Sequence, residues 1–248
     1  MRYLNLERLD ELNAEQFQSR KPYPWVNPAG LLTDAGYQTL YETLPDLSKF
    51  SASFGVARAH GQRPHDRYVL EYSERVELAE SWRAFIRELE SPQYHSFLQR
   101  MFGRRALRLK MHWHYAPAGS SVSPHCDARH KLGSHIFYFS NAGDWRPEWG
   151  GETLLLDDGG RFKRSSAPGF EDFDHVAATE SIGNRSLLFA RSGNSWHGVR
   201  EIHCPEGAMR KVFIVVINDP LRDTVRNAIN LITRRHRTGG HRAVDRPR

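Results

Sequence analysis

Residues 107–115 read LRLKMHWHY and alternate strictly between apolar and polar side chains. Successive side chains of a β-strand point to opposite faces of its sheet, so this stretch predicts one half-buried strand. The apolar face would carry Leu107, Leu109, Met111, Trp113 and Tyr115, and the polar face Arg108, Lys110, His112 and His114. We expect the apolar face to point inward, and His112 and His114 to face solvent or a second sheet.

More short strands are predicted after this one. Turn residues separate five further apolar segments, at residues 134–140, 151–157, 185–191, 196–202 and 210–219. Many short strands at intervals of about ten residues are typical of a β-sandwich or barrel. The last segment is apolar on both faces, which predicts a strand that is covered on both sides. We therefore expect the body of the chain to be a jelly-roll-like β structure.

Helices are predicted on either side of this β-rich body. Thr33 is a candidate N-cap for a helix that stops at Pro45, and residues 73–103 predict two helices broken near Ser91 and Pro92. Apolar residues from Val76 to Ile86 recur at helical spacing, which predicts packing against a sheet. Residues 54–73 predict two short strands around a polar turn, and a further helix is expected from residue 220.

The predicted fold class is thus α+β. Residues 1–104 are expected to form a mixed, mainly helical support region, and residues 105–220 the β core. Residues 221–248 are expected to form a C-terminal helix and a basic tail. We expect these three parts to belong to a single structural domain.

Composition excludes several classes of protein. The chain has 248 residues, of which 39% are hydrophobic, and no apolar run approaches the ~20 residues that span a bilayer. Its charged first segment lacks the apolar region of a secretory signal. The two cysteines, Cys126 and Cys204, are too few for a disulfide framework and favour a cytoplasmic location. Each follows a histidine, but neighbours on a strand diverge, which disfavours a Cys/His zinc site.

The positive charge is concentrated in the tail. The net charge is +6, and residues 233–248 alone contain six arginines and one aspartate. This tail has no aromatic residue on which a base could stack, so nucleic-acid binding is disfavoured.

A candidate metal site is the main chemical feature. His125 and Asp127 are two residues apart, so in an extended segment they point the same way. A third ligand is available in His197, at the head of a predicted strand. Two histidines and one carboxylate form the facial triad that suits non-haem Fe(II) oxygen chemistry. Arg210 could pair with a carboxylate of a dianionic cosubstrate, and Lys211, on the opposite face, is the alternative.

Residues from about 107 to 219 resemble the prolyl-4-hydroxylase-like branch of the Fe(II)/2-oxoglutarate-dependent dioxygenases. HYAPAGSSVSPHCD (114–127) resembles the Tyr-x-Pro-x-Gly…Pro-His-x-Asp segment of that family. HIFYFSNAGDWRPEWGGETLLL (135–156) is similar to its strand, Asp-Trp turn and Gly-Gly-Glu strand. SWHGVREIHCPEGAMRKVFIVVIND (195–219) resembles the segment with the distal histidine and the basic residue. The resemblance covers roughly half the chain.

This resemblance implies a fold and a set of residue roles. The core would be a double-stranded β-helix (jelly roll), with N-terminal helices packed on its major sheet. Fe(II) would be bound by His125, Asp127 and His197, and the distal carboxylate of 2-oxoglutarate by Arg210. The hydroxyls of Tyr115 and Tyr138 would lie near the cosubstrate, with core packing as the alternative for both.

The implied activity is oxidation, most simply hydroxylation, of a substrate C–H bond, coupled to decarboxylation of 2-oxoglutarate to succinate. Oxygen is the second cosubstrate, and ascorbate is a further candidate cofactor. The substrate, either a small molecule or a protein side chain, and the oligomeric state stay open. Candidate lids over the site are residues 59–67, 141–149 and 162–178.

Three other functions are compatible with parts of the sequence. The first is a catalytically inactive jelly-roll protein that binds or senses a metal. The second is a zinc or other metal hydrolase, which is disfavoured because no candidate base has a convincing spacing. The third is an enzyme that uses its basic tail to contact nucleic acid.

Overall fold

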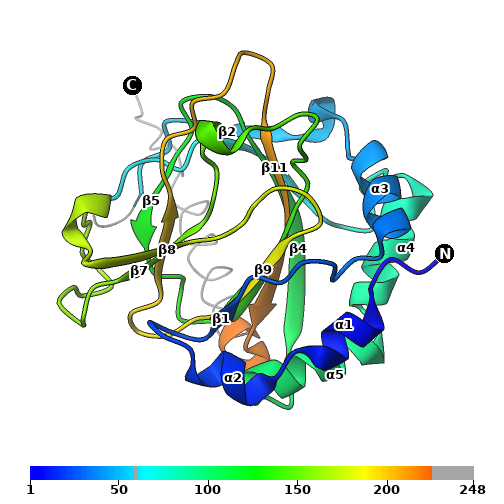
Figure 1. The fold of residues 1–248 in the computed structure, drawn as a ribbon, viewed down its shortest axis with the longest axis horizontal. Helices are drawn as coiled ribbons and strands as arrows, with labels where there is room; N and C mark the ends of the chain where they lie inside the picture. The colour runs from blue at the N-terminus through cyan, green and yellow to red at the C-terminus, as the bar shows by residue number, and fades with distance from the viewer. Residues whose placement is uncertain (59–60, 225–248) are drawn as a thin grey trace, which may run out of the picture.

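Two antiparallel sheets of unequal size face each other in the computed structural model, which describes residues 1–58 and 61–224 (Figure 1). The larger sheet has the strand order β1-β9-β6-β11-β4-β3-β2. Its strands are β1 (Trp25–Val26), β2 (Ser51–Ser53), β3 (Arg67–Glu71), β4 (Arg108–Ala116), β6 (Lys131–Tyr138), β9 (Ser186–Ala190) and β11 (Arg210–Asn218). This major sheet contains the stretch that alternates at residues 107–115.

The smaller sheet has four strands in the order β5-β10-β7-β8. They are β5 (Val122–His125), β7 (Leu154–Asp157), β8 (His175–Ala178) and β10 (Trp196–Val199). Successive strands cross repeatedly between the two sheets, which gives the predicted jelly-roll core of an α+β protein. Short 3₁₀ helices lie in its connections, at Pro147–Trp149 and Phe170–Asp172.

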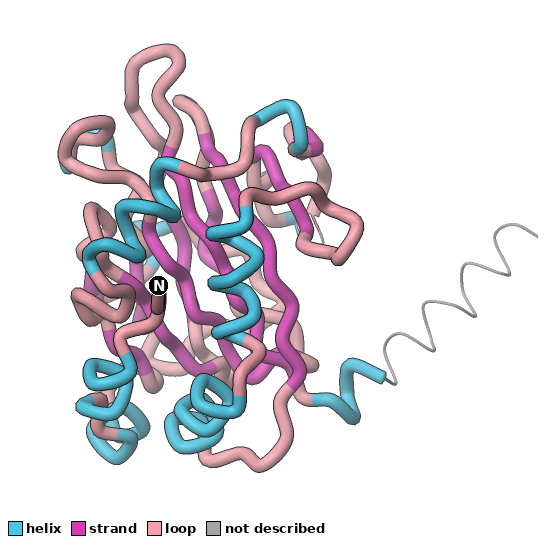
Figure 2. Tube along the Cα trace, turned by 90° about the vertical axis from the view of Figure 1, so that its right-hand side faces the viewer, coloured by secondary structure: helices cyan, strands magenta, loops and turns pink. Residues whose placement is uncertain are grey.

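Helices cover the outer face of the major sheet, as Figure 2 shows from that side. They are α1 (Leu6–Glu11), α2 (Ala14–Ser19), α3 (Asp34–Glu42), α4 (Glu80–Leu89) and α5 (Pro92–Phe102), with a 3₁₀ turn at Leu47–Lys49. The Thr33 hydroxyl caps α3 by accepting from Gly36 N, and Ser91 caps α5 with Pro92 in its first turn. The predicted helix boundaries are confirmed at these positions.

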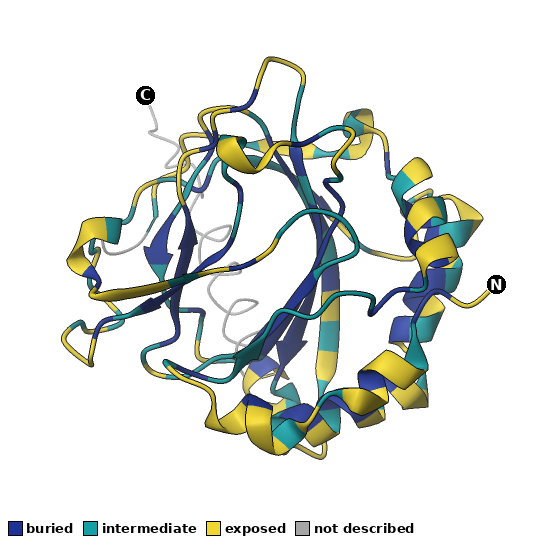
Figure 3. Ribbon diagram, viewed as in Figure 1, coloured by how far each residue is buried: buried dark blue, intermediate teal, exposed yellow. Residues whose placement is uncertain are grey.

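The main core lies between these helices and the major sheet. The ring of Trp82 on α4 lies 5.1 Å, between centroids, from both Trp113 on β4 and Phe213 on β11. All three side chains are fully buried. The helices accordingly turn their buried sides to the sheet and their exposed sides outward (Figure 3). Of the predicted stripe, Trp82, Phe85 and Ile86 are confirmed as core, whereas residues 76–79 precede the helix and Ala79 is exposed.

The two faces of β4 agree with the prediction: its apolar face is buried in the core, and its polar face meets the second sheet, one of the two positions expected for the histidines. The apolar face with Trp113 and Tyr115 packs on the outer helices, whereas His112 and His114 face the second sheet. Alternation in the sequence identifies the two faces of a strand. In β4 the helices cover the more apolar face. The central strand β11, which pairs with β4 and β6, is buried on both faces as predicted.

Two further details differ from the sequence-based expectations, and a third agrees with them as far as the described residues extend. Residues 175–178, expected within a lid, form β8 at the edge of the minor sheet. The two strands expected within residues 54–73 correspond to β3 and to β2, which lies slightly earlier; with the unexpected β1 they extend the major sheet at its two ends. Of the expected C-terminal helix, residues 220–224 are helical, and its remainder and the basic tail lie outside the described residues.

Within residues 1–58 and 61–224, no helix has both the length and the apolar composition that a membrane span requires.

Candidate metal centre

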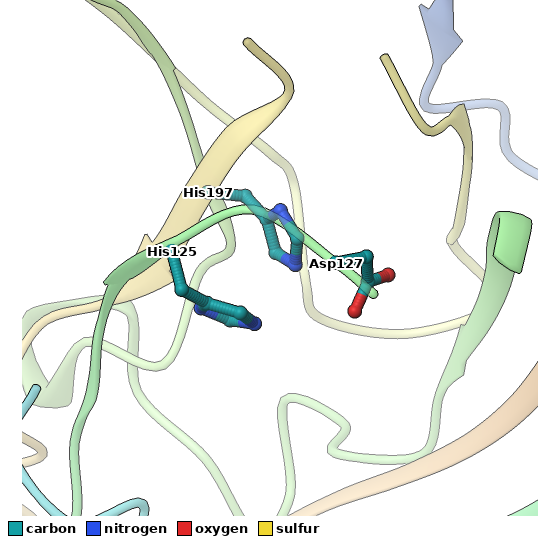
Figure 4. A group of neighbouring side chains, drawn as sticks. All are labelled: His125, Asp127 and His197. Atoms are coloured by element: carbon teal, nitrogen blue, oxygen red, sulfur yellow. The ribbon is translucent and has the colours of Figure 1, made fainter. Parts of the chain in front are cut away.

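Three side chains meet on the inner face of the minor sheet (Figure 4). His125 ends β5, Asp127 follows two residues later, and His197 lies on β10 directly opposite His125 in the strand register. One ligand atom from each residue lies within 4.8 Å of the others. Metal–ligand distances are about 2.1 Å, so one ion between these atoms could reach all three after small side-chain rotations.

This group is the one cluster of three or more potential ligands in the part of the chain that the structure describes. The sequence predicted these three residues, and the structure brings them together. Two imidazoles and one carboxylate are a donor set that suits non-haem Fe(II).

A glycine permits the close strand pairing beneath the centre. Gly198 follows His197, and a Cβ atom there would lie 2.6 Å from the carbonyl oxygen of Val122 on β5. It would also lie 2.9 Å from the ring of Phe170. Any larger residue would therefore have to move β5 away from β10, and with it His125 away from His197. The sequence analysis did not identify this glycine.

Backbone carbonyls orient both imidazoles. Nδ1 of His125 lies 3.0 Å from the carbonyl oxygen of Ser123, and Nδ1 of His197 lies 3.0 Å from that of Ser195. A carbonyl only accepts hydrogen bonds, so each Nδ1 carries the proton and each Nε2 keeps a free lone pair. Burial lowers the pKa of both histidines below its ordinary value. Both rings are therefore neutral near pH 7, as metal ligands must be.

Asp127 is buried and ionised beside them. Burial acts to raise the pKa of its carboxyl group, but the positive charge of Lys131 and the hydrogen bond that it donates act to lower it, and the pKa lies below its ordinary value. The ammonium group of Lys131 donates to Oδ1 of Asp127 at 2.6 Å. One carboxylate oxygen is thus anchored, and the other is left for a metal. Sequence analysis missed Lys131, whose only visible sign is its position four residues after Asp127.

A cavity of about 550 Å³ adjoins the three residues, between the two sheets. Its lining includes His112 and His114 of β4 and an apolar wall of Ile136, Val212 and Ile214. This volume lies within the ordinary range of small-molecule sites. The polar face of β4 therefore forms part of the cavity lining.

Arg210 also lines this cavity, at the start of β11. Its side chain is buried, its Nε donates to the carbonyl of Gly151, and its Nη2 lies 3.3 Å from the Thr153 hydroxyl. A Cβ atom at Gly151, where φ is 93°, would lie 3.0 Å from Cδ of Arg210, so this glycine makes room for the guanidinium stem. Burial lowers the pKa of Arg210, while Tyr138 and Glu152 counteract that effect.

Lys211 lies on the opposite face of β11, where its ammonium group pairs with Asp144 at 2.8 Å. Of the two candidates for a cosubstrate carboxylate, Arg210 is thus the one that faces the cavity.

The two predicted tyrosines occupy different places. The hydroxyl of Tyr138 hydrogen-bonds to Thr153 at 2.9 Å and to Thr179 at 3.0 Å, and Arg210 lies over its ring at 5.6 Å. Tyr115 lies on the helix-covered face of β4, where its hydroxyl donates to the carbonyl of Pro45 at 3.1 Å. Its ring stacks on Phe50 at 4.3 Å. The structure therefore brings Tyr138 next to Arg210 and places Tyr115 outside the cavity, because odd-numbered residues of β4 face the helices.

The three candidate lids differ in whether they line the cavity. Gln62, His65 and Arg67 from the first, and Arg164 from the third, line the cavity. The segment 141–149 does not line it, and Trp145 from this segment packs in a separate apolar cluster with Ile202 and Cys204.

No known family model matches the sequence, and no curated protein matches it. Solved structures do match its fold. A Pseudomonas putida prolyl-4-hydroxylase superposes with a TM-score of 0.58 at 14% identity, over 83% of this chain and 96% of that one. A Trichoplax adhaerens prolyl hydroxylase, solved with a hypoxia-inducible-factor peptide, gives 0.63 at 16% identity, over 89% and 93%. The non-haem α-ketoglutarate-dependent epimerase SnoN of nogalamycin biosynthesis gives 0.57 at 16%, over 86% and 80%.

At these identities the likeness concerns the fold. The chain has the double-stranded β-helix fold of prolyl-4-hydroxylase-like 2-oxoglutarate enzymes, as the sequence motifs predicted.

Proposed function

We propose that this protein is an Fe(II)- and 2-oxoglutarate-dependent oxygenase that oxidises a C–H bond of its substrate. One observation carries the proposal: the His125–Asp127–His197 group and the buried guanidinium of Arg210 line the same cavity of a double-stranded β-helix. The metal group alone would suit a binding protein as well. A buried cation beside it is costly without an anionic partner, and a dicarboxylate cosubstrate would provide one.

When bound, iron, 2-oxoglutarate and oxygen supply the oxidation, and 2-oxoglutarate leaves as succinate and carbon dioxide. The chain's own residues bind and orient these groups. His125 and His197 offer Nε2 because their Nδ1 atoms are held by carbonyls, and Asp127 offers the oxygen that Lys131 does not hold. A facial set of three ligands leaves the remaining positions open for small molecules.

Arg210 would bind the distal carboxylate of 2-oxoglutarate. Thr153 positions its guanidinium and also accepts from the Tyr138 hydroxyl, so these three polar groups form one end of the site. Ile136, Val212 and Ile214 give the cavity an apolar wall that limits water around the reacting groups. Ascorbate and the exact oxidative outcome stay predictions from the family resemblance.

Anaerobic titration tests the proposal directly. Purified metal-free protein receives Fe(II) and then 2-oxoglutarate, while the metal-to-ligand charge-transfer absorption is followed. We expect the band to appear in the wild type and to be absent in His197→Ala. The matched control is His203→Ala, which removes an exposed histidine outside the cavity and should leave the band unchanged.

The alternative outcome has a defined meaning. If the folded protein binds Fe(II) but gives no band with 2-oxoglutarate, the protein is a jelly-roll metal-binding or sensing protein instead.

A further inference from the structure

The metal cavity contains more positive charge than the proposed iron and cosubstrate require. Five cationic side chains line it, Arg58, Arg67, Lys131, Arg164 and Arg210, against the two carboxylates of Glu71 and Asp127. Fe(II) would add two positive charges and 2-oxoglutarate two negative ones, which cancel. An excess of three positive charges therefore remains for the substrate to meet.

Two of the arginines lie close to each other. Burial lowers the pKa of the Arg67 guanidinium, and the positive charge of Arg58 lowers it further. Burial also lowers the pKa of His65 to about 3, with both arginines contributing, so this imidazole is neutral at pH 7. The His65 ring lies 4.8 Å from the ring of His125. Arg58 and Arg67 thus form a cationic cluster next to the neutral ring of His65, beside one of the candidate metal ligands.

The hydrogen bonds of these arginines involve neutral groups. Arg58 donates to the side-chain oxygen of Gln62 at 3.4 Å, and Arg67 to the carbonyl of His65 at 2.6 Å and to Nε2 of His114 at 3.3 Å. Arg164, from another loop, donates to the backbone carbonyl of Asp127 at 3.2 Å.

Among the described residues, no carboxylate forms a close ion pair with these three guanidinium groups, although the charge of Asp127 acts on Arg58 and that of Asp66 acts on Arg67. Within the described ranges, none lies within 4.0 Å of Arg58, Arg67 or Arg164. Asp66 is next to Arg67 in sequence, but its carboxylate accepts from Gly55 N. Glu71 lies at the other end of β3, roughly 13 Å along the strand. Two like charges that are partly desolvated and unpaired repel each other, and a bound anion would relieve this cost.

Arg67 of the cluster and Arg210 belong to different strands of the major sheet. Arg210 pairs with Ala116, and Arg67 precedes Tyr68, which pairs with Tyr115, so β4 lies between the backbones of the two arginines. Two strand spacings separate them by roughly 10 Å. We expect a cosubstrate that joins the metal to Arg210 to leave Arg58 and Arg67 available for a further anion.

We infer that Arg58 and Arg67, with Arg164, bind an anionic group of the substrate, a carboxylate or a phosphate, and hold the substrate beside the metal centre. This inference rests on the proposed function, because it assigns the substrate class of the same site. Guanidinium groups suit both anions, since each can receive two parallel hydrogen bonds from one arginine. The cavity volume of about 550 Å³ favours a small molecule.

Paramagnetic relaxation tests the inference without turnover. The full-length protein is loaded with Mn(II) and saturated with 2-oxoglutarate, and Zn(II)-loaded protein provides the diamagnetic reference. Phenyl phosphate, phenylacetate and the neutral phenylacetamide are the probes, and their nuclear relaxation is measured against protein concentration. We expect faster relaxation of at least one anionic probe and no effect on phenylacetamide. Which anion responds identifies the phosphate or the carboxylate as the preferred group.

Variants then assign the residues. Arg58→Gln and Arg67→Gln should each weaken binding of the responding anion at least fivefold. Arg75→Gln, an exposed arginine outside the cavity, should not change it. If Arg67→Gln fails to fold, Arg58→Gln decides, because the one described side-chain hydrogen bond of Arg58 is with Gln62. Equal binding of phenylacetamide, no response to either anion, or unchanged binding in Arg58→Gln would overturn the inference.

Relaxation of 2-oxoglutarate protons in the same samples separates the two proposals. If 2-oxoglutarate approaches Mn(II) but neither anionic probe does, the substrate class is wrong and the proposed function stands. If an anionic probe binds through Arg58 while 2-oxoglutarate does not bind at all, the proposed function is wrong and the anion site stands.

Discussion

At the scale of single residues, Arg210 and Lys211 show how one step along a strand changes a side chain's role. Arg210 is buried in the cavity, and Lys211 lies on the other face in an ion pair with Asp144. Alternation in the sequence predicts that the two point apart, but it leaves open which one faces the cavity. That depends on which side of β11 the helices cover, a property of the whole fold.

We predict that Arg210→Ala weakens 2-oxoglutarate binding by about 30-fold, or about 2 kcal/mol, because it removes a charged hydrogen-bond donor from a buried site. Lys211→Ala should leave the affinity unchanged, since a partly exposed ion pair outside the cavity contributes little. The dissociation constant, measured from the anaerobic charge-transfer absorption, checks both. An effect of Lys211→Ala comparable with that expected for Arg210→Ala would move the cosubstrate contact to the neighbouring residue.

At the scale of elements, the metal site depends on a pairing between strands that are distant in sequence. His125 and Asp127 could be grouped from their spacing, and His197 from its motif. The β5–β10 register that sets His197 opposite His125 is a tertiary feature, and no local pattern reveals it. The short edge strand β8 was missed for a related reason. Its residues 175–178 are mostly exposed, and the pairing with β7 defines it as a strand.

Gly198→Ala should weaken metal binding at least tenfold while the fold persists. The new methyl group would meet the Val122 carbonyl at 2.6 Å, so β5 would have to shift and carry His125 away from His197. Titration with Co(II), followed through its visible absorption, measures the affinity, and circular dichroism checks the fold. The matched control is Gly193→Ala in the preceding loop, where a Cβ atom meets nothing within 4 Å. Equal affinities in the two variants would show that this strand contact does not position the ligands.

At the scale of the whole molecule, one hydrophobic core joins the regions before and after residue 104. Trp82 and Phe85 of α4 pack directly on Phe213 of β11, and strands from both regions share the major sheet. We therefore propose that the support region and the β core unfold together as a single domain. Composition and helical periodicity could predict these layers, because both depend on local patterns. They could not predict that the cavity would be lined by the polar face of β4.

The stability of the protein should depend on a buried histidine outside the metal cavity. His135 on β6 is fully buried, and its Nδ1 shares a hydrogen bond of 2.8 Å with the hydroxyl of Tyr94 on α5. Burial lowers the pKa of His135 from 6.5 to about 3. Between these two pH values the unfolded chain binds a proton that the folded protein excludes. The stability that the protein gains by keeping His135 neutral is therefore fully present above pH 6.5, and it is lost as the pH falls towards 3.

The free energy of unfolding should accordingly decrease by up to about 1.4 kcal/mol per pH unit below pH 6.5 from this residue alone. His135→Gln keeps a hydrogen-bonding side chain but does not titrate, so its slope against pH should be shallower by about one proton. Urea unfolding at several pH values between 6.5 and 4.5 measures the slopes, and a single transition at each pH would support one domain. His175→Gln, at an exposed position on β8, should retain the wild-type slope. An unchanged slope in His135→Gln would mean that His135 accepts its proton in the folded protein, and that the contact between α5 and β6 opens to admit it.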